Sequence, residues 1–253
     1  MNSTNNALYN YCLRLADNNL ILGQRLAEWC SQGPTLEEDL ALTNISLDLI
    51  GQAESFYEFA TTFTEANCTA DDLAFLRSER EFVNNVLVEQ PNGDFAYTIM
   101  KQFLFSTFAK HLYTALANSS NQTICGLATK GLKEVNYHYM HSSQWLIRLG
   151  NGTDKSKEKI QFAANDLWCF TKDMFEMNSV DTLLIEQNIT INLSTIYTPW
   201  KNDIEQVFKI ATIDLPTDTN KIIGGIKGIH TEHLGHILCE MQYLQRAHPG
   251  AKW

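Results

Sequence analysis

The scarcity of chain-breaking residues is the feature of this sequence that most constrains its fold. Only 13 glycines and 5 prolines interrupt 253 residues. A sandwich or barrel of many short strands needs more frequent turns, so this composition favours long helices. A chain of this length buries roughly 75% of its unfolded surface and needs no disulfide or metal ion in order to fold. We therefore expect an all-α protein with a single domain over residues 1–253.

Apolar residues recur at helical spacing along most of the chain. The predicted long helices cover about 5–30, 35–63, 95–117 and 122–149. Short links between long helices imply antiparallel neighbours, as in a four-helix bundle. Shorter helices are expected at about 71–88, 154–177, 199–211 and 229–247. The predicted fold class is all-α, a ferritin-like four-helix bundle with additional helices.

Several residues are expected to begin these helices or to interrupt them. Side chains suited to N-caps are Thr35, with Glu38 completing a capping box, and Asp71, Asp94 and Asp154. Pro199 suits the first turn of a helix. The β-branched run 189–196 favours a short strand or an irregular loop, and residues 212–228 are expected to form a mobile loop.

Charge and cysteine usage exclude several classes of protein. The net charge of -10 argues against nucleic acid or an anionic membrane as a partner, because both require clustered positive charge. No uncharged apolar run reaches 18 residues, so no membrane-spanning segment is expected. The six cysteines lie far apart, and the N-terminus lacks the pattern of a signal peptide. We expect reduced, mostly buried cysteines in a cytoplasmic protein.

A helical bundle of this size raises the question of a di-iron site. Such a site takes a glutamate from one helix and Glu-x-x-His from the next, and repeats this in the second pair. No histidine precedes His111, and the helix expected at 95–117 contains no carboxylate. In the following helix, Glu134 has Tyr137 three residues later in place of histidine. A metal-free polar core, with Glu134 able to pair with Lys130, is the favoured interpretation. The candidates for a site remnant are Glu28, Asp48, Glu134 and His138.

A second polar cluster lies near the C-terminus. His233, His236 and Glu240 share one face of the expected last helix, at a spacing suited to zinc, and His230 lies just before them. This set would support a metal-dependent hydrolase, the weakest of our hypotheses. The favoured alternative is that Thr231 caps the helix while the histidines form hydrogen bonds at a packing surface. The chain contains no His-Glu-x-x-His, no G-x-S-x-G and no phosphate-binding glycine loop. We therefore expect it to contribute no catalytic or metal-binding residue.

Several long segments, in order along the chain, resemble one family. They are Leu15–Asn18, Leu22–Cys30, Asn44–Ala53, Val88–Gly93, Lys133-Glu134 with Tyr137-His138, Arg148–Asp154, Gly228–Gly235 and Glu240–Arg246. Over nearly its whole length the chain resembles the C-subunit family of the bacterial multicomponent phenylacetyl-CoA epoxidases, the ring 1,2-phenylacetyl-CoA monooxygenases. None of these segments is by itself a catalytic motif, and the signal comes from their number and order.

The resemblance implies a ferritin-like subunit that holds no cofactor itself. In that family a homologous A subunit holds the di-iron centre and performs the chemistry. A reductase with flavin and an iron–sulfur cluster delivers electrons from NADPH, and oxygen epoxidises the aromatic ring of the CoA thioester. We expect a non-catalytic structural subunit that binds and stabilises the A subunit within a heteromer. The alternative is a di-iron oxygenase in its own right that uses Glu28, Asp48, Glu134 and His138.

Aromatic side chains are the candidates for contacts with such a partner. The helix expected at 95–117 is rich in them, and Trp29, Trp145 and Trp168 are further candidates. Packing in the protein core is the favoured interpretation for most of them.

Overall fold

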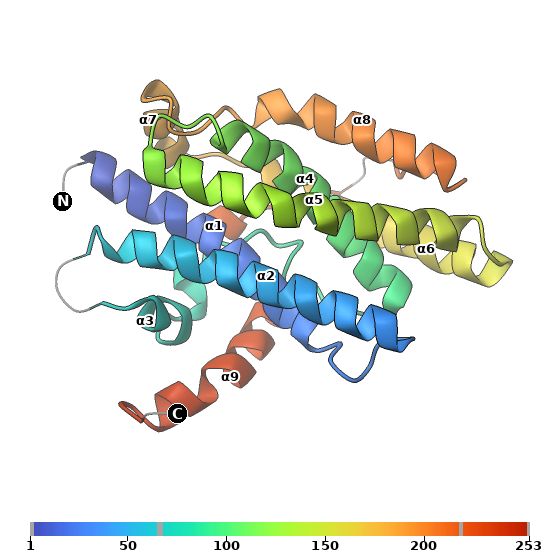
Figure 1. Cartoon of the computed structure of the whole chain (residues 1–253), viewed down its shortest axis with the longest axis horizontal. Coiled ribbons are helices and arrows are strands. Elements are labelled where there is room, and N and C mark those ends of the chain that lie inside the picture. Colours follow the sequence, from blue (N-terminus) through green and yellow to red (C-terminus); the bar gives the residue numbers. More distant parts are fainter. Residues whose placement is uncertain (1–2, 65–67, 218–219, 252–253) are drawn as a thin grey trace. The chain divides into compact units, whose positions relative to one another are not determined.

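The computed structural model describes residues 3–64, 68–217 and 220–251, and these residues form nine α-helices and no strand (Figure 1). The predicted all-α class is therefore confirmed. Within the same ranges, no helix has the length and apolar character required to cross a bilayer.

The chain divides into two compact units. The first consists of Met1–Pro91, Asn178–Leu184 and Gly224–Trp253, and the second of Asn92–Met177 and Ile185–Ile223. The two units are described one at a time below, and the single domain over residues 1–253 stays a prediction.

The first unit is built on an antiparallel pair of long helices, α1 (Ser3–Ala27) and α2 (Leu36–Thr61), which lie side by side (Figure 1). A Cβ atom at Gly23 would lie 3.0 Å from Cγ1 of Ile50, so glycine permits their close approach. The Ser46 hydroxyl donates to the Gly23 carbonyl oxygen at 2.8 Å. The unit is completed by α3 (Ala70–Phe75), the 3-10 helices η1 (Glu79–Glu81) and η3 (Gly225–Lys227), most of α7 (Ser179–Glu186), and α9 (Glu232–Ala247).

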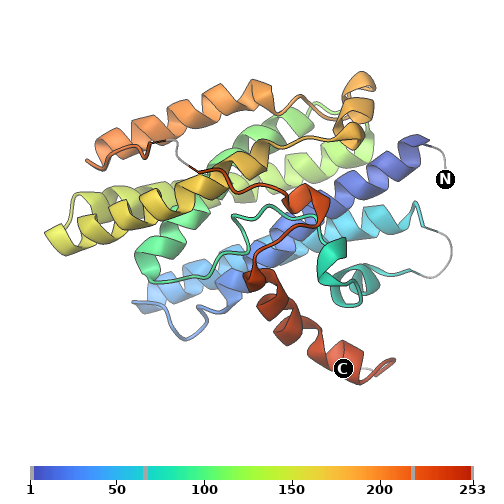
Figure 2. The ribbon, with the colours of Figure 1, turned by 180° about the vertical axis from the view of Figure 1, so that it is seen from behind.

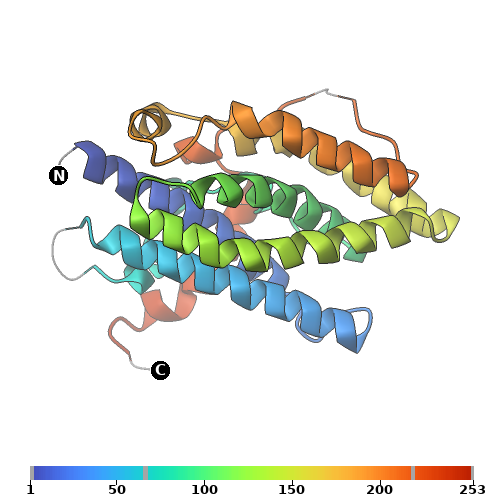
Figure 3. The ribbon, with the colours of Figure 1, turned by 45° about the horizontal axis from the view of Figure 1, so that its top comes forward.

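The second unit packs around α4 (Phe95–Leu116). This helix contacts α5 (Gln122–Gly150), α6 (Asp154–Leu167) and α8 (Ser194–Ile210), and Figure 3 shows α8 running beside α4 and α5. Trp200 on α8 donates from Nε1 to the Leu104 carbonyl oxygen at 3.1 Å. Its ring stacks on Trp168, which begins the 3-10 helix η2 (Trp168–Phe175), with ring centroids 5.7 Å apart. The aromatic helix and Trp168 therefore serve the core, whereas Trp29 and Trp145 are half-buried.

N-capping side chains account for several observed helix starts. Asp94 caps α4, as predicted, by accepting a hydrogen bond from the Tyr97 amide at 3.0 Å. The predicted capping box at Thr35 is wrong, since that side chain makes no capping hydrogen bond. Thr69, rather than Asp71, caps α3, and Thr153, rather than Asp154, caps α6.

The predicted helix over 71–88 is wrong beyond Phe75. Residues 82–94 contain no helix, and most of the stretch 82–90 is buried. Two of its amides bond to side chains of α1: Val83 N donates to Asp17 Oδ2 at 2.9 Å, and Asn85 N donates to Asn18 Oδ1 at 2.7 Å. Figure 2 shows this segment as an irregular loop. Tertiary hydrogen bonds thus replace the helical ones that local propensity favours.

Residues 178–198 form α7, an irregular stretch over 187–193 and the start of α8. Of the two alternatives for 189–196, the irregular loop is confirmed up to residue 193, and no strand forms there. Helix α8 begins at Ser194, so Pro199 lies inside it rather than in its first turn. The buried side chains of Ile196 and Trp200 anchor this first part of α8, and such packing overrides local propensity. The helix expected over 154–177 ends at Leu167 and continues as η2.

The six cysteines carry no disulfide, and all of them lie within the described ranges. The prediction that most are buried is wrong, because only Cys12 is buried. Cys30 and Cys239 are exposed, and the other three are half-buried. Burial raises the pKa of the Cys12 thiol, which keeps this thiol protonated and unreactive.

Candidate functional site

The buried carboxylate of Glu89 gathers hydrogen bonds from two distant parts of the first unit. One oxygen, Oε2, accepts from Asn84 Nδ2 at 2.9 Å and faces His230 Nδ1 at 2.8 Å. The other, Oε1, accepts from the amide of Thr231 at 2.6 Å and from its hydroxyl at 2.8 Å. The side chains of Glu89 and His230 are completely buried. Four donors saturate this carboxylate, so it is a structural anchor rather than an open ligand.

His230 is a cation in this setting. Its Nε2 lies 2.8 Å from the Phe82 carbonyl oxygen, while Nδ1 faces Glu89. Because both ring nitrogens face acceptors, this geometry favours a proton on each of them. Burial alone would lower the pKa of His230, but the hydrogen bond and the charge of Glu89 outweigh it and raise that pKa above its ordinary value. A buried ion pair therefore joins the start of α9 to the segment 82–90.

A second buried cluster surrounds Asp17 on α1. Its Oδ1 accepts a hydrogen bond from the Tyr57 hydroxyl at 2.5 Å, and both of its oxygens pair with the Arg77 guanidinium. The guanidinium carbon also lies 4.2 Å from the ring centroid of Phe82. Burial opposes the charge on Arg77, but Asp17 raises the pKa of this guanidinium. Burial first, and then the charge of Asp17, raise the pKa of Tyr57, so the phenol stays protonated.

Two further arginines extend this polar face of α1. Arg14 forms a two-pronged pair with Asp181, with Nη1 3.0 Å from Oδ2. Arg25 donates from Nε and Nη2 to the Glu89 carbonyl oxygen at 3.1 and 2.9 Å, and from Nη2 to the His233 carbonyl oxygen at 3.4 Å. Helix α1 thus holds together segments from three separate regions of the sequence. We call the side chains Arg14, Asp17, Arg25, Tyr57, Arg77, Glu89, Asp181 and His230 the α1 polar network.

A glycine makes the turn into this network possible. Gly228 has φ +68°, a conformation that disfavours side chains with a Cβ. A Cβ atom there would also lie 2.3 Å from the Arg80 carbonyl oxygen. Glycine therefore lets the chain turn tightly two residues before His230.

The predicted remnant residues belong to both units. Glu28 follows the end of α1, is exposed, and pairs with Arg25 at 2.8 Å, and Asp48 is half-buried on α2. On α5, in the second unit, Glu134 is half-buried and His138 is buried. Helix α4 buries Lys101, whose Nζ lies 3.2 Å from Asn92 Oδ1. Across residues 3–64, 68–217 and 220–251, no three His, Cys, Asp or Glu side chains gather in a way that could hold a metal ion.

The cluster predicted near the C-terminus is divided. His230 points into the α1 polar network, whereas His236 and Glu240 are exposed on α9 and His233 is half-buried. Thr231 precedes α9 as expected, but its side chain makes no capping hydrogen bond and donates to Glu89 instead. The structure thus supports the hydrogen-bonding interpretation for His230.

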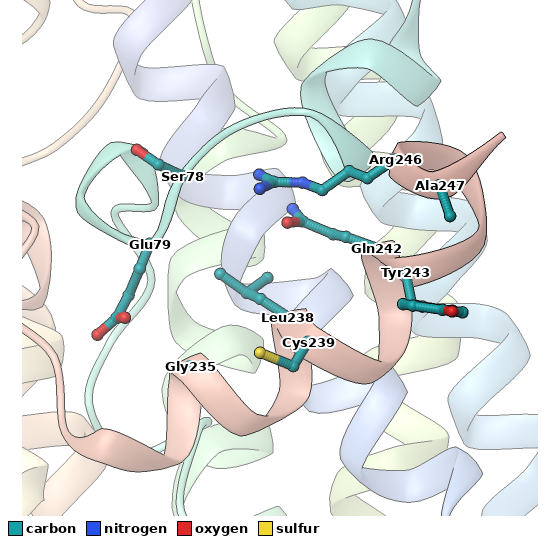
Figure 4. Close-up of a pocket in the computed structure, with 9 residues that line it drawn as sticks. All are labelled: Ser78, Glu79, Gly235, Leu238, Cys239, Gln242, Tyr243, Arg246 and Ala247. Carbon is teal, nitrogen blue, oxygen red and sulfur yellow. The ribbon is translucent and has the colours of Figure 1, made fainter. Parts of the chain in front are cut away.

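A groove of about 560 Å³ runs along α9 (Figure 4). Gln242 in its wall donates to the carbonyl oxygens of Ala74 and Arg77, both at 3.0 Å. Arg246 donates to the carbonyl oxygens of Leu76 and Arg77 at 3.2 and 2.8 Å. These two side chains satisfy the carbonyl groups at the end of α3, so they hold α9 in place.

Sequence reasoning missed the central residues of the network, Asp17, Arg77 and Glu89. No local signal marked Asp17, because it lies on the polar face of α1, where a carboxylate is expected to meet solvent. Its partner Arg77 lies 60 residues away. The pairing was therefore not readable from local spacing.

Comparisons with known proteins show the family of this chain. Residues 1–253 match the family model described as phenylacetic acid catabolic protein. The chain is 46% identical over 248 residues to the C subunit of the 1,2-phenylacetyl-CoA epoxidase of Escherichia coli K12, covering 98% of this chain and all of that protein. The predicted all-α, ferritin-like fold class is that of this family. The segments that suggested the resemblance include Asp17, Arg25, Glu89 and His230, which belong to the α1 polar network. The chain belongs to the phenylacetic acid catabolic protein family.

Proposed function

We propose that this chain is the non-catalytic structural subunit of a multicomponent phenylacetyl-CoA 1,2-epoxidase. In this role it binds and stabilises a homologous A subunit, which holds the di-iron centre and performs the epoxidation. The chain itself contributes no cofactor, and a separate reductase with flavin and an iron–sulfur cluster supplies electrons. The whole complex acts in aerobic phenylacetate catabolism in the cytoplasm.

One observation carries this proposal beyond similarity alone. Four ionisable residues of the family-like segments, Asp17, Arg25, Glu89 and His230, hold the fold together. Glu89 is saturated by four donors, and Asp17 by Arg77, Tyr57 and the Val83 amide. A catalytic carboxylate or metal ligand requires an open coordination position or a proton free to move, and these groups have neither. Such a polar network supports a rigid scaffold rather than a reaction centre.

The test is to prepare the chain alone and together with the A subunit of the same organism. We expect the chain alone to bind no stoichiometric iron and to leave phenylacetyl-CoA unchanged. The co-purified pair, supplied with reductase and NADPH, should bind iron and form the epoxide. Stoichiometric iron and turnover by the chain alone would establish the alternative, a di-iron oxygenase in its own right.

Variants of Glu134 and His138 further distinguish the structural subunit from the di-iron oxygenase. Glu134→Gln and His138→Asn should leave the iron content and the turnover number of the assembled complex within about twofold. Any effect should instead appear in thermal stability or in the yield of complex. A collapse of turnover in a folded, fully assembled Glu134→Gln complex would contradict the structural role.

A further inference from the structure

Three exposed leucines on α2 form a stripe that the fold of this chain does not use. Leu36, Leu40 and Leu47 are 72%, 54% and 61% exposed. Their spacing of four and seven residues places them within about 40° of arc on one side of the helix, over about 16 Å of its length. Isolated exposed leucines are ordinary, but an aligned set on one helix marks an interaction surface. We call these three residues the α2 leucine stripe.

The charges around this stripe restrict what can cover it. Helix α2 contains six carboxylates and no lysine, arginine or histidine. Of these, Glu37, Glu54 and Glu58 are exposed, while Asp39 and Asp48 are half-buried. The stripe is therefore an apolar strip of the helix surface with negatively charged side chains around it. Its best complement is an apolar helix face edged by lysine and arginine.

A second copy of this chain does not meet that requirement through the same helix. A symmetric contact would place α2 against α2 and so bring carboxylates opposite carboxylates. The net charge of -10 adds to the repulsion between two copies. The charge pattern therefore favours a different polypeptide.

We infer that the α2 leucine stripe is the docking surface for a basic, apolar helix face on the catalytic A subunit. This inference rests on the proposed function and adds to it the surface through which this chain binds its partner. Burial of the three leucines would supply affinity, and the carboxylates would select the partner and its orientation.

Substitution within the stripe tests the inference. Leu40→Lys with Leu47→Lys should weaken binding to the A subunit by about tenfold or more, because two apolar anchors become charged and meet a basic face. Both positions are exposed, so the melting temperature of the isolated chain should stay close to that of the parent. The matched control is Tyr243→Lys on α9, which is 66% exposed and lies outside the stripe. This control should change the dissociation constant by less than about twofold.

A charge change provides a second test that does not alter the leucines. Glu54→Lys with Glu58→Lys should also weaken binding, and the effect should shrink as salt is raised. Dissociation constants at low and high salt, measured by titration of the A subunit, give both results.

The possible results distinguish a failure of the inferred docking surface from a failure of the proposed function. If the parent chain binds the A subunit and the Leu40→Lys, Leu47→Lys chain binds equally well, the inference about the surface is wrong and the proposed function stands. If the parent chain does not bind the A subunit, the proposed function fails first. Self-association of the parent chain that Leu40→Lys abolishes would assign the stripe to a second copy and overturn the inference.

Discussion

Asp17 and Trp200 are both buried, but the interiors around them are held together in different ways. In the first unit, Asp17 belongs to a network of ion pairs that joins α1 to segments 60 and more residues away. In the second unit, Trp200 lies among aromatic rings from η2 and α8 and donates to a backbone carbonyl oxygen of α4. Ion pairs are directional and depend on pH, whereas aromatic packing depends on shape and area. The first unit is assembled from three separate stretches of the chain. The difference indicates that ion pairs fix the positions of these stretches.

The largest expected effect comes from breaking the ion pair at the centre of the first unit. Asp17→Asn should lower the free energy of unfolding by about 3–5 kcal/mol, because Arg77 remains buried without its counter-charge. Urea unfolding followed by circular dichroism measures this. Adding Arg77→Met should restore part of the loss, since no buried charge then lacks a partner. If the double variant loses as much free energy of unfolding as the two single variants lose together, Asp17 and Arg77 are not coupled.

A smaller effect, with a specific pH dependence, is expected at His230. His230→Gln should cost about 1.5–3 kcal/mol near pH 6, where the buried imidazolium is charged. The pKa of His230 is raised in the folded state above its ordinary value of about 6.5. The stabilisation by the His230 ion pair is therefore fully present at pH values below the ordinary pKa. It is lost as the pH rises through the raised pKa of the folded state. The difference between parent and variant should thus shrink as the pH is raised from 6 to 9. An equal difference at every pH would contradict the ionic pair.

The aromatic core should respond differently. Trp200→Phe should cost about 1–2 kcal/mol, because it removes the hydrogen bond to the Leu104 carbonyl oxygen and part of the stacking on Trp168. Neither contribution involves a titrating group, so the loss should stay constant between pH 6 and 9. A pH-dependent loss at Trp200 would remove the contrast between the two units.

The smallest expected effect belongs to an exposed ion pair. Glu28→Gln breaks the contact with Arg25, but 41% of the Glu28 side chain is exposed. Solvent screening then limits the cost to less than about 1 kcal/mol. The same variant tests Glu28 as a metal ligand, since iron in the complex with the A subunit should be unchanged. Loss of iron from that complex would contradict the assignment of the metal to the partner.

Much of the helical framework could be predicted from the sequence, because the interactions that form it join residues close together in the chain. Sparse glycine and proline, apolar residues at helical spacing and caps such as Asp94 act within a few residues of each other. The long helices α1, α2, α4 and α5 accordingly lie close to their predicted bounds. The lack of a Glu-x-x-His pattern was also readable, because both donors must lie on one face of one helix.

Other features depend on contacts between residues that are far apart in the sequence. Residues 76–88 continue a helical pattern locally, yet the amides of Val83 and Asn85 donate to Asp17 and Asn18, which keeps residues 82–85 out of a helix. Helix α8 begins before its proline because Ile196 and Trp200 pack in the core. The sequence alone thus determined which segments can form helices and which metal-ligand pattern is missing. Only the tertiary structure decided which polar groups pair and which leucines stay exposed, because both depend on long-range packing that local spacing does not encode.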